Sequence, residues 1–299
     1  MNIFYCTNEK YSQHVAVSIT SVIINNPSAI LDFYILSSNI SEESKDKILL
    51  CGKNNSNVNI KFYKVDHLKF KELKLNIEYI SIDTYFRYIL ADLFPKLDKG
   101  LYLDADTICN NDIRNLYDTN ISGFYAAGVR DSFIEDINYK QNISFSEDDL
   151  YVNAGVLLFN LKKMRDDSLT EVLFTKTREL SNEIRFQDQD IINIVFKNKI
   201  KELPNTFNCT SVDVSGKTVL QLNETAIFHY TGPQKPWNNF YSTGNTAEFF
   251  YYKYLKQSPY KNNYKKLVFN NLNKYVFSRT KSGKSRRINI LGLNFFYNK

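Results

Sequence analysis

Short apolar runs typical of β-strands alternate with segments of helical periodicity over the first 240 residues of this 299-residue chain. The strand-like runs are 2–7, 31–36, 58–65, 100–106, 123–129 and 152–160, and the helical patterns are 15–23, 84–94, 169–180 and 189–196, with a further helix opening at Ser41. Strand–helix–strand alternation at this spacing is typical of a mostly parallel sheet covered by helices. We therefore expect an α/β, Rossmann-like fold with a mostly parallel sheet flanked by helices.

In a sheet of this kind, ligands bind beyond the carboxyl ends of the strands. The polar ends of NIFYCTN (2–8) and GLYLDAD (100–106) are therefore the expected rim of a binding site. The chain has no GxGxxG motif after its first strand and no GxxxxGKS or GxxxxGKT motif. A dinucleotide-binding fold and a P-loop nucleotide hydrolase therefore have no support.

Two aspartates, Asp104 and Asp106, end the apolar run that begins at Gly100. On an extended chain, side chains two positions apart point the same way, and two carboxylates held that close repel each other unless a cation lies between them. Carboxylate oxygens suit Mg²⁺ or Mn²⁺, which often bind one or two protein carboxylates together with substrate phosphates. The sequence therefore indicates a divalent-cation site at this edge of the sheet.

Three other interpretations of the acid pair compete with a cation site. An EF-hand loop needs an oxygen ligand and a glycine where this chain has Ile108 and Cys109, so that interpretation fails. A phosphatase of the haloacid-dehalogenase type would use Asp104 as its nucleophile, but it has Thr or Val at the position of Ile108. An exposed turn without a ligand stays open at this point.

Six segments follow one another along the chain, namely MNIFYCTNEKY, ISIDTYFRYIL, LYLDADT, YVNAGVLLFNLKK, FQDQDIIN and FHYTGPQKPW. In these segments the sequence closely resembles family 8 glycosyltransferases, in particular the bacterial lipooligosaccharide α-galactosyltransferases, from residue 1 to about residue 237. The resemblance implies a GT-A-type fold for a glycosyltransferase domain over residues 1–245. It also implies retaining, Mn²⁺- or Mg²⁺-dependent transfer of a hexose, galactose before glucose, from a UDP-sugar to a lipooligosaccharide or lipopolysaccharide acceptor. A haloacid-dehalogenase-like phosphatase and a non-catalytic, membrane-associated nucleotide-sugar binder stay as alternatives.

The resemblance assigns roles to individual residues. The implied metal ligands are Asp104, Asp106 and His229, and the implied catalytic residues are Asp188, Gln189 and Asp190. The implied donor-binding residues are Cys6, Thr7, Asn8, Lys10, Tyr11, Thr84, Arg87, Asp104, Ala105, Asp131, Asn153, Gly232 and Lys235. Within this set, the turn after the first strand would hold uridine and ribose, and Gly232 and Lys235 would close over the diphosphate.

The chain departs from the family pattern in the uridine turn. Asn8 stands where an aspartate is common, and Lys10 stands where an asparagine follows. Asn8 can still form hydrogen bonds with the uracil edge or the ribose, but the stronger acceptor of a carboxylate is lost.

Two catalytic routes follow from the residue types near Gln189. In the first, acceptor and departing UDP share one face of the sugar, a phosphate oxygen takes the acceptor's proton, and the Gln189 carbonyl stabilises the developing positive charge. In the second, Asp190 acts as a nucleophile on the opposite face. We expect the first.

The C-terminal segment differs in charge from the rest of the chain, whose net charge is +6. Residues 249–299 contain twelve Lys and Arg, seven Tyr and six Phe, and no Asp or Glu. Such a segment suits an anionic membrane surface, with nucleic acid or plain packing of the aromatic side chains as alternatives. We expect residues 246–299 to form a basic, aromatic, helical tail that associates with the membrane, and we expect no nucleic-acid partner.

The expected location is the cytoplasm, with the enzyme peripheral on the inner face of the cytoplasmic membrane. The chain has no apolar run of roughly 18 residues that could cross a bilayer, and its start lacks the pattern of a secretory signal. Its four cysteines are widely spaced, which fits a reducing compartment.

Overall fold

The computed structural model describes residues 1–77, 81–238, 246–282, 285–290 and 293–298, with the backbone alone over 270–296 and at 298. The strands are β1 (Asn2–Cys6), β2 (Leu31–Ser37), β3 (Val58–Lys64), β4 (Lys99–Leu103), β5 (Thr107–Cys109), β6 (Ala126–Arg130), β7 (Val152–Asn160), β8 (Ile200–Leu203), β9 (Cys209–Thr210), β10 (Ile227–His229), β11 (Phe277–Ser282), β12 (Ser285–Ile290) and β13 (Leu293–Asn298). The α-helices are α1 (Ser12–Asn25), α2 (Glu42–Leu49), α3 (Leu90–Leu93), α4 (Arg114–Tyr117), α5 (Ser132–Asp136), α6 (Leu161–Asp166), α7 (Leu169–Glu179), α8 (Gln187–Val195), α9 (Val219–Leu222), α10 (Glu248–Leu255) and α11 (Lys261–Val276). The 3₁₀-helices are η1 (Glu9–Tyr11), η2 (His67–Phe70), η3 (Ile82–Ile89), η4 (Tyr139–Ile143) and η5 (Asn205–Phe207).

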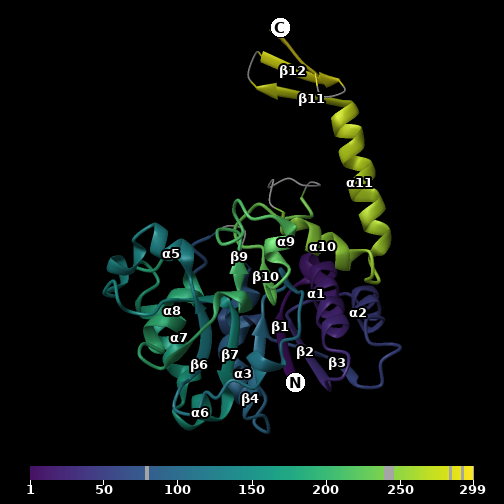
Figure 1. Ribbon diagram of the computed structural model, residues 1–299. Coiled ribbons are helices and arrows are strands. Elements are labelled where there is room, and N and C mark those ends of the chain that lie inside the picture. The colour runs from purple at the N-terminus through teal and green to yellow at the C-terminus, as the bar shows by residue number, and fades with distance from the viewer. Residues whose placement is uncertain (78–80, 239–245, 283–284, 291–292, 299) are drawn as a thin grey trace.

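A seven-stranded sheet in the order β3-β2-β1-β4-β7-β6-β8 forms the centre of the protein (Figure 1). Its neighbouring strands pair in parallel, except that β7 runs antiparallel to both β4 and β6. The predicted mostly parallel sheet flanked by helices is therefore confirmed.

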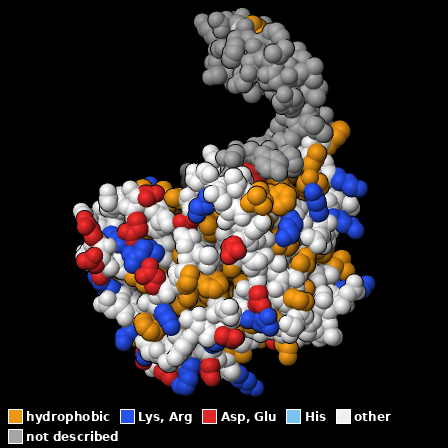
Figure 2. Space-filling model, in the orientation of Figure 1, with side chains coloured by type: hydrophobic (Ala, Val, Ile, Leu, Met, Phe, Trp, Pro, Cys, Tyr) orange, Lys and Arg blue, Asp and Glu red, His pale blue; other side chains and the backbone are white. Residues whose placement is uncertain are grey.

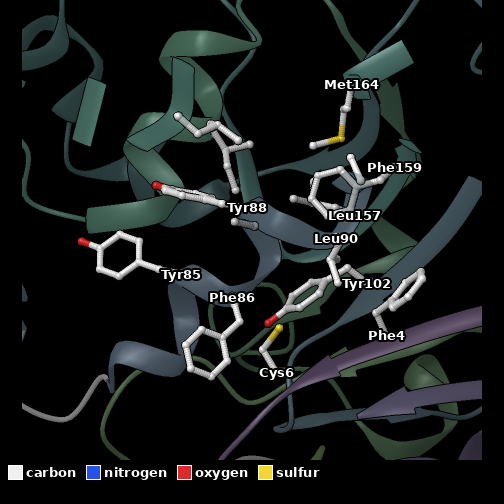
Figure 3. Packing of buried hydrophobic residues seen from close by; sticks show 14 of the residues in the cluster. Phe4, Cys6, Tyr85, Phe86, Tyr88, Leu90, Tyr102, Leu157, Phe159 and Met164 are labelled. Carbon is white, nitrogen blue, oxygen red and sulfur yellow. The ribbon is translucent and has the colours of Figure 1, made fainter. Parts of the chain in front are cut away.

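Both faces of the central sheet are covered, and β1 shows how. Ile3 and Tyr5 pack with α1 and α2 on one face, whereas Phe4 and Cys6 belong to the core on the other face. Successive side chains of a strand alternate between faces, so a strand buried on both sides reads as continuously apolar. Figure 3 shows part of the second core, in which Phe4 and Cys6 of β1 and Tyr102 of β4 belong to one cluster with Tyr85, Phe86 and Tyr88 of η3.

A small second sheet brings a distant segment to the edge of the central one. Strand β10 pairs antiparallel with β5, so that His229 lies opposite Thr107. Thr107 comes directly after the acid pair, and the backbone N–H of Thr107 donates to the carbonyl of Asp104 at 3.2 Å. This pairing places His229 beside Asp104 and Asp106, more than a hundred residues earlier in the chain.

Two local predictions need correction. The strand predicted over 100–106 ends at Leu103, so Asp104 and Asp106 lie in a turn rather than on an extended strand. The helix predicted over 84–94 is mostly the 3₁₀-helix η3, and only its end, α3, is α-helical. Arg87 and Thr84 of η3 bond to other elements, and this tertiary anchoring competes with regular α-helical winding.

The first part of the predicted tail belongs to the core. Phe250, Tyr251, Tyr252 and Tyr254 of α10 are buried in one cluster with Phe228 and Tyr230 of the β10 region, so packing explains them, whereas Phe249 is exposed. Helix α11 then leads away from this body to an antiparallel sheet in the order β11-β12-β13 (Figure 1). The helical prediction for the tail thus applies up to Val276, after which strands follow. None of the described helices has the length and apolar character needed to span a bilayer.

Candidate active site

A cleft of about 820 Å³ lies where β1 and β4 end and β7 begins. Every residue predicted for the site lines it except Asp190. Polar groups from strands, η3 and α8 therefore converge on the edge where a sheet of this type binds ligands.

Three potential metal ligands meet in this cleft. One ligand atom from each of Asp104, Asp106 and His229 can be chosen so that all lie within 4.8 Å of one another. The Nε2 atom of His229 is 3.3 Å from Oδ1 of Asp106 and 3.6 Å from Oδ2 of Asp104. Two carboxylates and one imidazole suit Mn²⁺ or a similar divalent cation, with open positions for a substrate.

Gly155 of β7 borders the space between these three side chains. A Cβ atom at this position would lie 2.1 Å from Cε1 of His229 and 2.8 Å from Oδ2 of Asp104. Any other residue would therefore displace a ligand, and the glycine fits a centre that must stay open for an ion. Sequence reasoning missed Gly155, although the quoted segment YVNAGVLLFNLKK contains it.

Hydrogen bonds from Tyr102 and Arg87 hold the carboxylate of Asp104 in position. Its Oδ1 accepts hydrogen bonds from Tyr102 Oη at 2.6 Å and from Arg87 Nη2 at 2.9 Å, while Oδ2 lies on the His229 side. One oxygen of this carboxylate is therefore bonded to Tyr102 and Arg87, and the other faces Nε2 of His229.

The guanidinium group of Arg87 forms ion pairs with two carboxylates, those of Asp104 and Asp188. Its Nε is 3.1 Å from Oδ2 of Asp188, its Nη2 bonds to Asp104, and its Nη1 donates to the carbonyl of Ala154 at 2.6 Å. The side chain is 4% exposed, so Arg87 is a buried residue of η3. The geometry indicates a positioning role for this predicted donor-binding residue, because these N–H groups already bond to the protein.

Lys235 lies against the other aspartate. Its Nζ is 2.5 Å from Oδ2 of Asp106 and also donates to the carbonyl of Tyr230. Burial alone would raise the pKa of Asp106, but the charges of Lys235 and His229 outweigh it and hold that pKa well below its usual range. Gly232 has φ +80°, the left-handed region that glycine adopts without strain.

Trp237 anchors the segment that carries Gly232 and Lys235. Its ring stacks on His14 of α1 with centroids 3.6 Å apart, and Tyr11 meets it edge-on at 6.0 Å. This packing connects the segment to the turn that follows β1.

The sugar-side residues form one polar network. Nε2 of Gln189 and Nδ2 of Asn153 both donate to Oδ2 of Asp131 at 3.0 Å, and Oε1 of Gln189 accepts from the backbone N–H of Ala154 at 3.0 Å. Oδ1 of Asp131 caps α5, so this carboxylate serves both the helix and the network. Burial raises the pKa of Asp188 to about 6, against the opposing charge of Arg87.

Comparison with known proteins identifies the family. The family model described as Glycosyl transferase family 8 matches residues 2–240. The chain belongs to glycosyltransferase family 8. It is 32% identical to the lipopolysaccharide 1,2-glucosyltransferase of Escherichia coli K12, over 87% of this chain and 79% of that protein. It is 30% identical to the lipopolysaccharide 1,3-galactosyltransferase of Salmonella typhimurium, over 80% of this chain and 73% of that protein.

The fold agrees with a solved member of the same group. The crystal structure of the galactosyltransferase LgtC in complex with donor and acceptor sugar analogues superposes with a TM-score of 0.76 at 27% identity, covering 86% of this chain and 96% of that chain. The expected GT-A-type fold is therefore confirmed for this family 8 chain.

Asp190 is the predicted residue that this family 8 site does not bring to the cleft. Its carboxylate accepts from Tyr151 Oη at 2.5 Å, from Tyr139 Oη at 2.8 Å, and from the backbone N–H groups of Arg185 and Phe186. The side chain is fully buried among these donors. A nucleophile must reach the substrate, so the geometry speaks against the second catalytic route.

The turn after β1, which is predicted to hold uridine, contains a partly buried polar cluster. Nδ2 of Asn8 donates to Ser81 Oγ at 3.0 Å and faces Oδ2 of Asp83 at 3.4 Å. Oδ1 of Asn8 is buried and has no hydrogen-bond partner in the described part of the chain. Lys10, the second departure from the family pattern, is exposed at the rim of the cleft.

Asn208 is a further polar residue of the site that sequence reasoning missed. It lies in the loop before β9, and its Oδ1 is 3.1 Å from Nδ1 of His229. A single asparagine 21 residues before a histidine carries no local signal, because only the fold brings the two side chains together.

Proposed function

We propose that this family 8 chain is a retaining, divalent-metal-dependent hexosyltransferase. It transfers a hexose, galactose before glucose, from a UDP-sugar to a lipooligosaccharide or lipopolysaccharide acceptor. The observation that carries the proposal is the convergence of Asp104, Asp106 and His229 around the space beside Gly155. The printed functions of the Escherichia coli and Salmonella relatives support the class of acceptor.

Asp104, Asp106 and His229 would hold Mn²⁺, or Mg²⁺ in its place. When bound, the ion supplies a Lewis acid for the diphosphate of the departing UDP. Lys235 lies beside Asp106, so its ammonium is placed to contribute a further positive charge toward the diphosphate. Family membership leaves the phosphatase alternative without support, and Asp104 is already fixed by Tyr102 and Arg87.

The end of the cleft at β1 is the proposed nucleotide site. Asn8 lines the cleft beside Ser81 and Asp83, and a turn of its side chain toward the cleft would let its unpartnered Oδ1 accept a hydrogen bond from an N–H group of the base. Uracil offers such a group at its imide. An unpartnered buried acceptor is costly, so a base that supplies the donor is favoured.

The proposed chemistry retains the anomeric configuration with acceptor and leaving group on one face of the sugar. Gln189 lines the cleft and is oriented by Asp131 and the backbone of Ala154, so its amide dipole is fixed beside the sugar position. A preorganised dipole stabilises positive charge that develops in the transition state. The burial of Asp190 supports this route over a covalent intermediate on that residue.

Two measurements test the enzyme proposal. Calorimetry of UDP binding with and without Mn²⁺ should show binding that depends on the ion, and absence of UDP binding in Mn²⁺ would refute the proposal. A screen of UDP-sugars, with the anomer of the product assigned by NMR, should show turnover of UDP-galactose with retention. Binding without any turnover, even hydrolysis by water, would instead support the non-catalytic nucleotide-sugar binder.

We also propose that the region beyond α10 holds the enzyme on the inner face of the cytoplasmic membrane. Lys256, Lys265 and Lys266 are exposed, and Phe269, on the same face of α11 as the last two, is 62% exposed. Lys and Arg side chains gather on the visible face beside α10 and the start of α11 (Figure 2). Exposed lysines near an anionic bilayer contribute about 1 kcal/mol each.

Charge reversal tests the membrane proposal. Replacing Lys265 and Lys266 together by Glu should lower the fraction of protein bound to anionic liposomes while UDP binding stays unchanged. Replacing Lys162 and Lys163 of α6 by Glu is the matched control, because it changes the net charge equally at the far end of the body. Equal loss of liposome binding in both double variants would show that net charge alone matters and would contradict the proposal.

A further inference from the structure

A buried chain of hydrogen bonds joins the Nδ1 side of His229 to Asp131. His229 Nδ1 is 3.1 Å from Asn208 Oδ1, Asn208 Nδ2 donates to Asn153 Oδ1 at 3.0 Å, and Asn153 Nδ2 donates to Asp131 Oδ2 at 3.0 Å. Asn208 is 1% exposed and Asn153 is 6% exposed. These four residues, His229, Asn208, Asn153 and Asp131, are called the Asn208 relay below.

The direction of the relay is set at its Asn153 end. Oδ1 of Asn153 accepts from the backbone N–H of Gly155 at 3.0 Å, and a backbone amide can only donate. Nδ2 of Asn153 donates to the carboxylate of Asp131, and an ionised carboxylate can accept hydrogen bonds but cannot donate them. Turning the Asn153 amide over would oppose donor to donor and acceptor to acceptor, so its orientation is determined.

The orientation of Asn153 determines that of Asn208. Because Asn153 presents an oxygen, Asn208 must present its NH₂ group there, which turns Oδ1 of Asn208 toward His229. An amide oxygen only accepts, so the proton of a neutral His229 must reside on Nδ1. The other tautomer would place two acceptors against each other at a position that water does not reach.

The tautomer matters because of what lies on the other side of the ring. With Nδ1 protonated, Nε2 is the nitrogen left to bind a cation, and it lies 3.3 Å from Oδ1 of Asp106 and 3.6 Å from Oδ2 of Asp104. A histidine binds a metal ion only through a nitrogen that carries no proton. The hydrogen bond of the second nitrogen commonly selects the liganding one.

We infer that Asn208 is a positioning residue that selects the Nδ1–H tautomer of His229 and thereby prepares Nε2 to bind a divalent cation. The inference rests on the proposed function, since it takes Asp104, Asp106 and His229 as the ligands. The relay ends on Asp131, which also accepts from Gln189 at 3.0 Å, so the cation site and the sugar side share one hydrogen-bond network.

The tautomer is measured directly by NMR on the metal-free, full-length protein labelled with ¹⁵N-histidine. The His229 signals are those missing from a His229→Gln variant. In the wild type, Nδ1 should be protonated, because Asn208 presents only an acceptor to it. Asn208→Leu should populate the Nε2–H tautomer, whereas Asn208→Asp retains an acceptor and should keep the proton on Nδ1. An unprotonated Nδ1 in the wild type, or an Nδ1 that stays protonated in Asn208→Leu, would overturn the inference.

Metal affinity supplies the second measurement. Calorimetry of Mn²⁺ in the presence of UDP should show about 10- to 100-fold weaker binding for Asn208→Leu, and a smaller loss for Asn208→Asp. Asn205→Ala is the matched control, because Asn205 lies in the same segment and its Nδ2 bonds only to Asp213 among the described residues, at 2.9 Å. Equal affinity in Asn208→Leu and the wild type, or an equal loss in Asn205→Ala, would count against the relay.

The two proposals fail in different ways. If the wild type binds neither Mn²⁺ nor UDP, the proposed function fails, while the tautomer in the metal-free protein still decides the relay. If Asn208→Leu does not fold, the inference about Asn208 is tested by the protonation of Nδ1 in the wild type and in Asn208→Asp.

Discussion

Two acidic pairs with the same spacing, Asp104/Asp106 and Asp188/Asp190, have different environments in this protein. Asp104 and Asp106 lie in a turn, and both carboxylates lie near Nε2 of His229. Asp188 and Asp190 lie in the first turn of α8, where only Asp188 lines the cleft. Asp190 is buried among donors from Tyr139, Tyr151 and the backbone instead.

The backbone explains the difference. Successive residues of an α-helix are rotated by about 100°, so side chains two positions apart point to nearly opposite sides. In the turn after β4, the two aspartates can converge, and Lys235 and His229 lower the pKa of Asp106. Burial raises the pKa of both Asp188 and Asp190. The same two-residue spacing therefore indicates a metal site only where the backbone makes the two carboxylates converge.

Among the substitutions that test the difference between the two acidic pairs, Asp106→Asn should have the largest effect on metal binding and turnover. The substitution removes one proposed anionic ligand, so we expect Mn²⁺ binding to be lost and turnover of UDP-sugar to fall by about 10³-fold, since metal assistance to a leaving group contributes several kcal/mol. Calorimetry and initial rates measure both effects. Asp106→Asn with wild-type Mn²⁺ affinity would remove Asp106 from the proposed metal site.

Gly155→Ala tests the space between the converging carboxylates. The added methyl group would lie 2.1 Å from Cε1 of His229, so the ring must move. We expect Mn²⁺ affinity to fall by about 100-fold, in the upper range for disturbed ligand positioning. Circular dichroism and thermal unfolding provide the control for folding. Unchanged affinity would show that the space beside Gly155 is not where the ion binds.

Asp190→Asn should affect stability rather than metal binding. The new NH₂ group would face donors that now bond to the carboxylate, which costs about 1–3 kcal/mol for each buried group left unsatisfied. We expect urea unfolding to report a free energy of unfolding lower by about 2 kcal/mol, with Mn²⁺ affinity unchanged. A large loss of turnover in a variant of normal stability would instead return Asp190 to the catalytic residues.

The pH dependence of stability should show the smallest effect. Burial raises the pKa of Asp188 to about 6 in the folded protein, above about 3.9 for an unfolded chain. The folded state therefore binds this proton more tightly, and the contribution of Asp188 to stability rises as pH falls from about 6 to about 4. The free energy of unfolding of the wild type minus that of Asp188→Asn should be about 1 kcal/mol larger at pH 5 than at pH 7. Urea unfolding at both pH values measures it, and a pH-independent difference would contradict the raised pKa.

Local pattern predicted much of the fold. The strand-like and helical runs correspond to β1, β2, β3 and β7 and to α1, α7 and α8, because periodicity reflects burial directly. The short strands β5, β9 and β10 were missed, since two or three residues carry no periodicity. The acid pair and the edge of the sheet were found from residue type and position, whereas the ligand role of His229 came from family resemblance.

By itself, the sequence determined that strands and helices alternate, that polar groups follow β1 and β4, and that two carboxylates stand together after an apolar run. Such features depend on neighbours in the chain. Only the tertiary structure decided that β10 pairs with β5 to bring His229 to those carboxylates, that Gly155 leaves room between them, and that Asn208 bonds to His229. These contacts join residues from separate elements, and the packing of the sheets, rather than any local pattern, sets their distances.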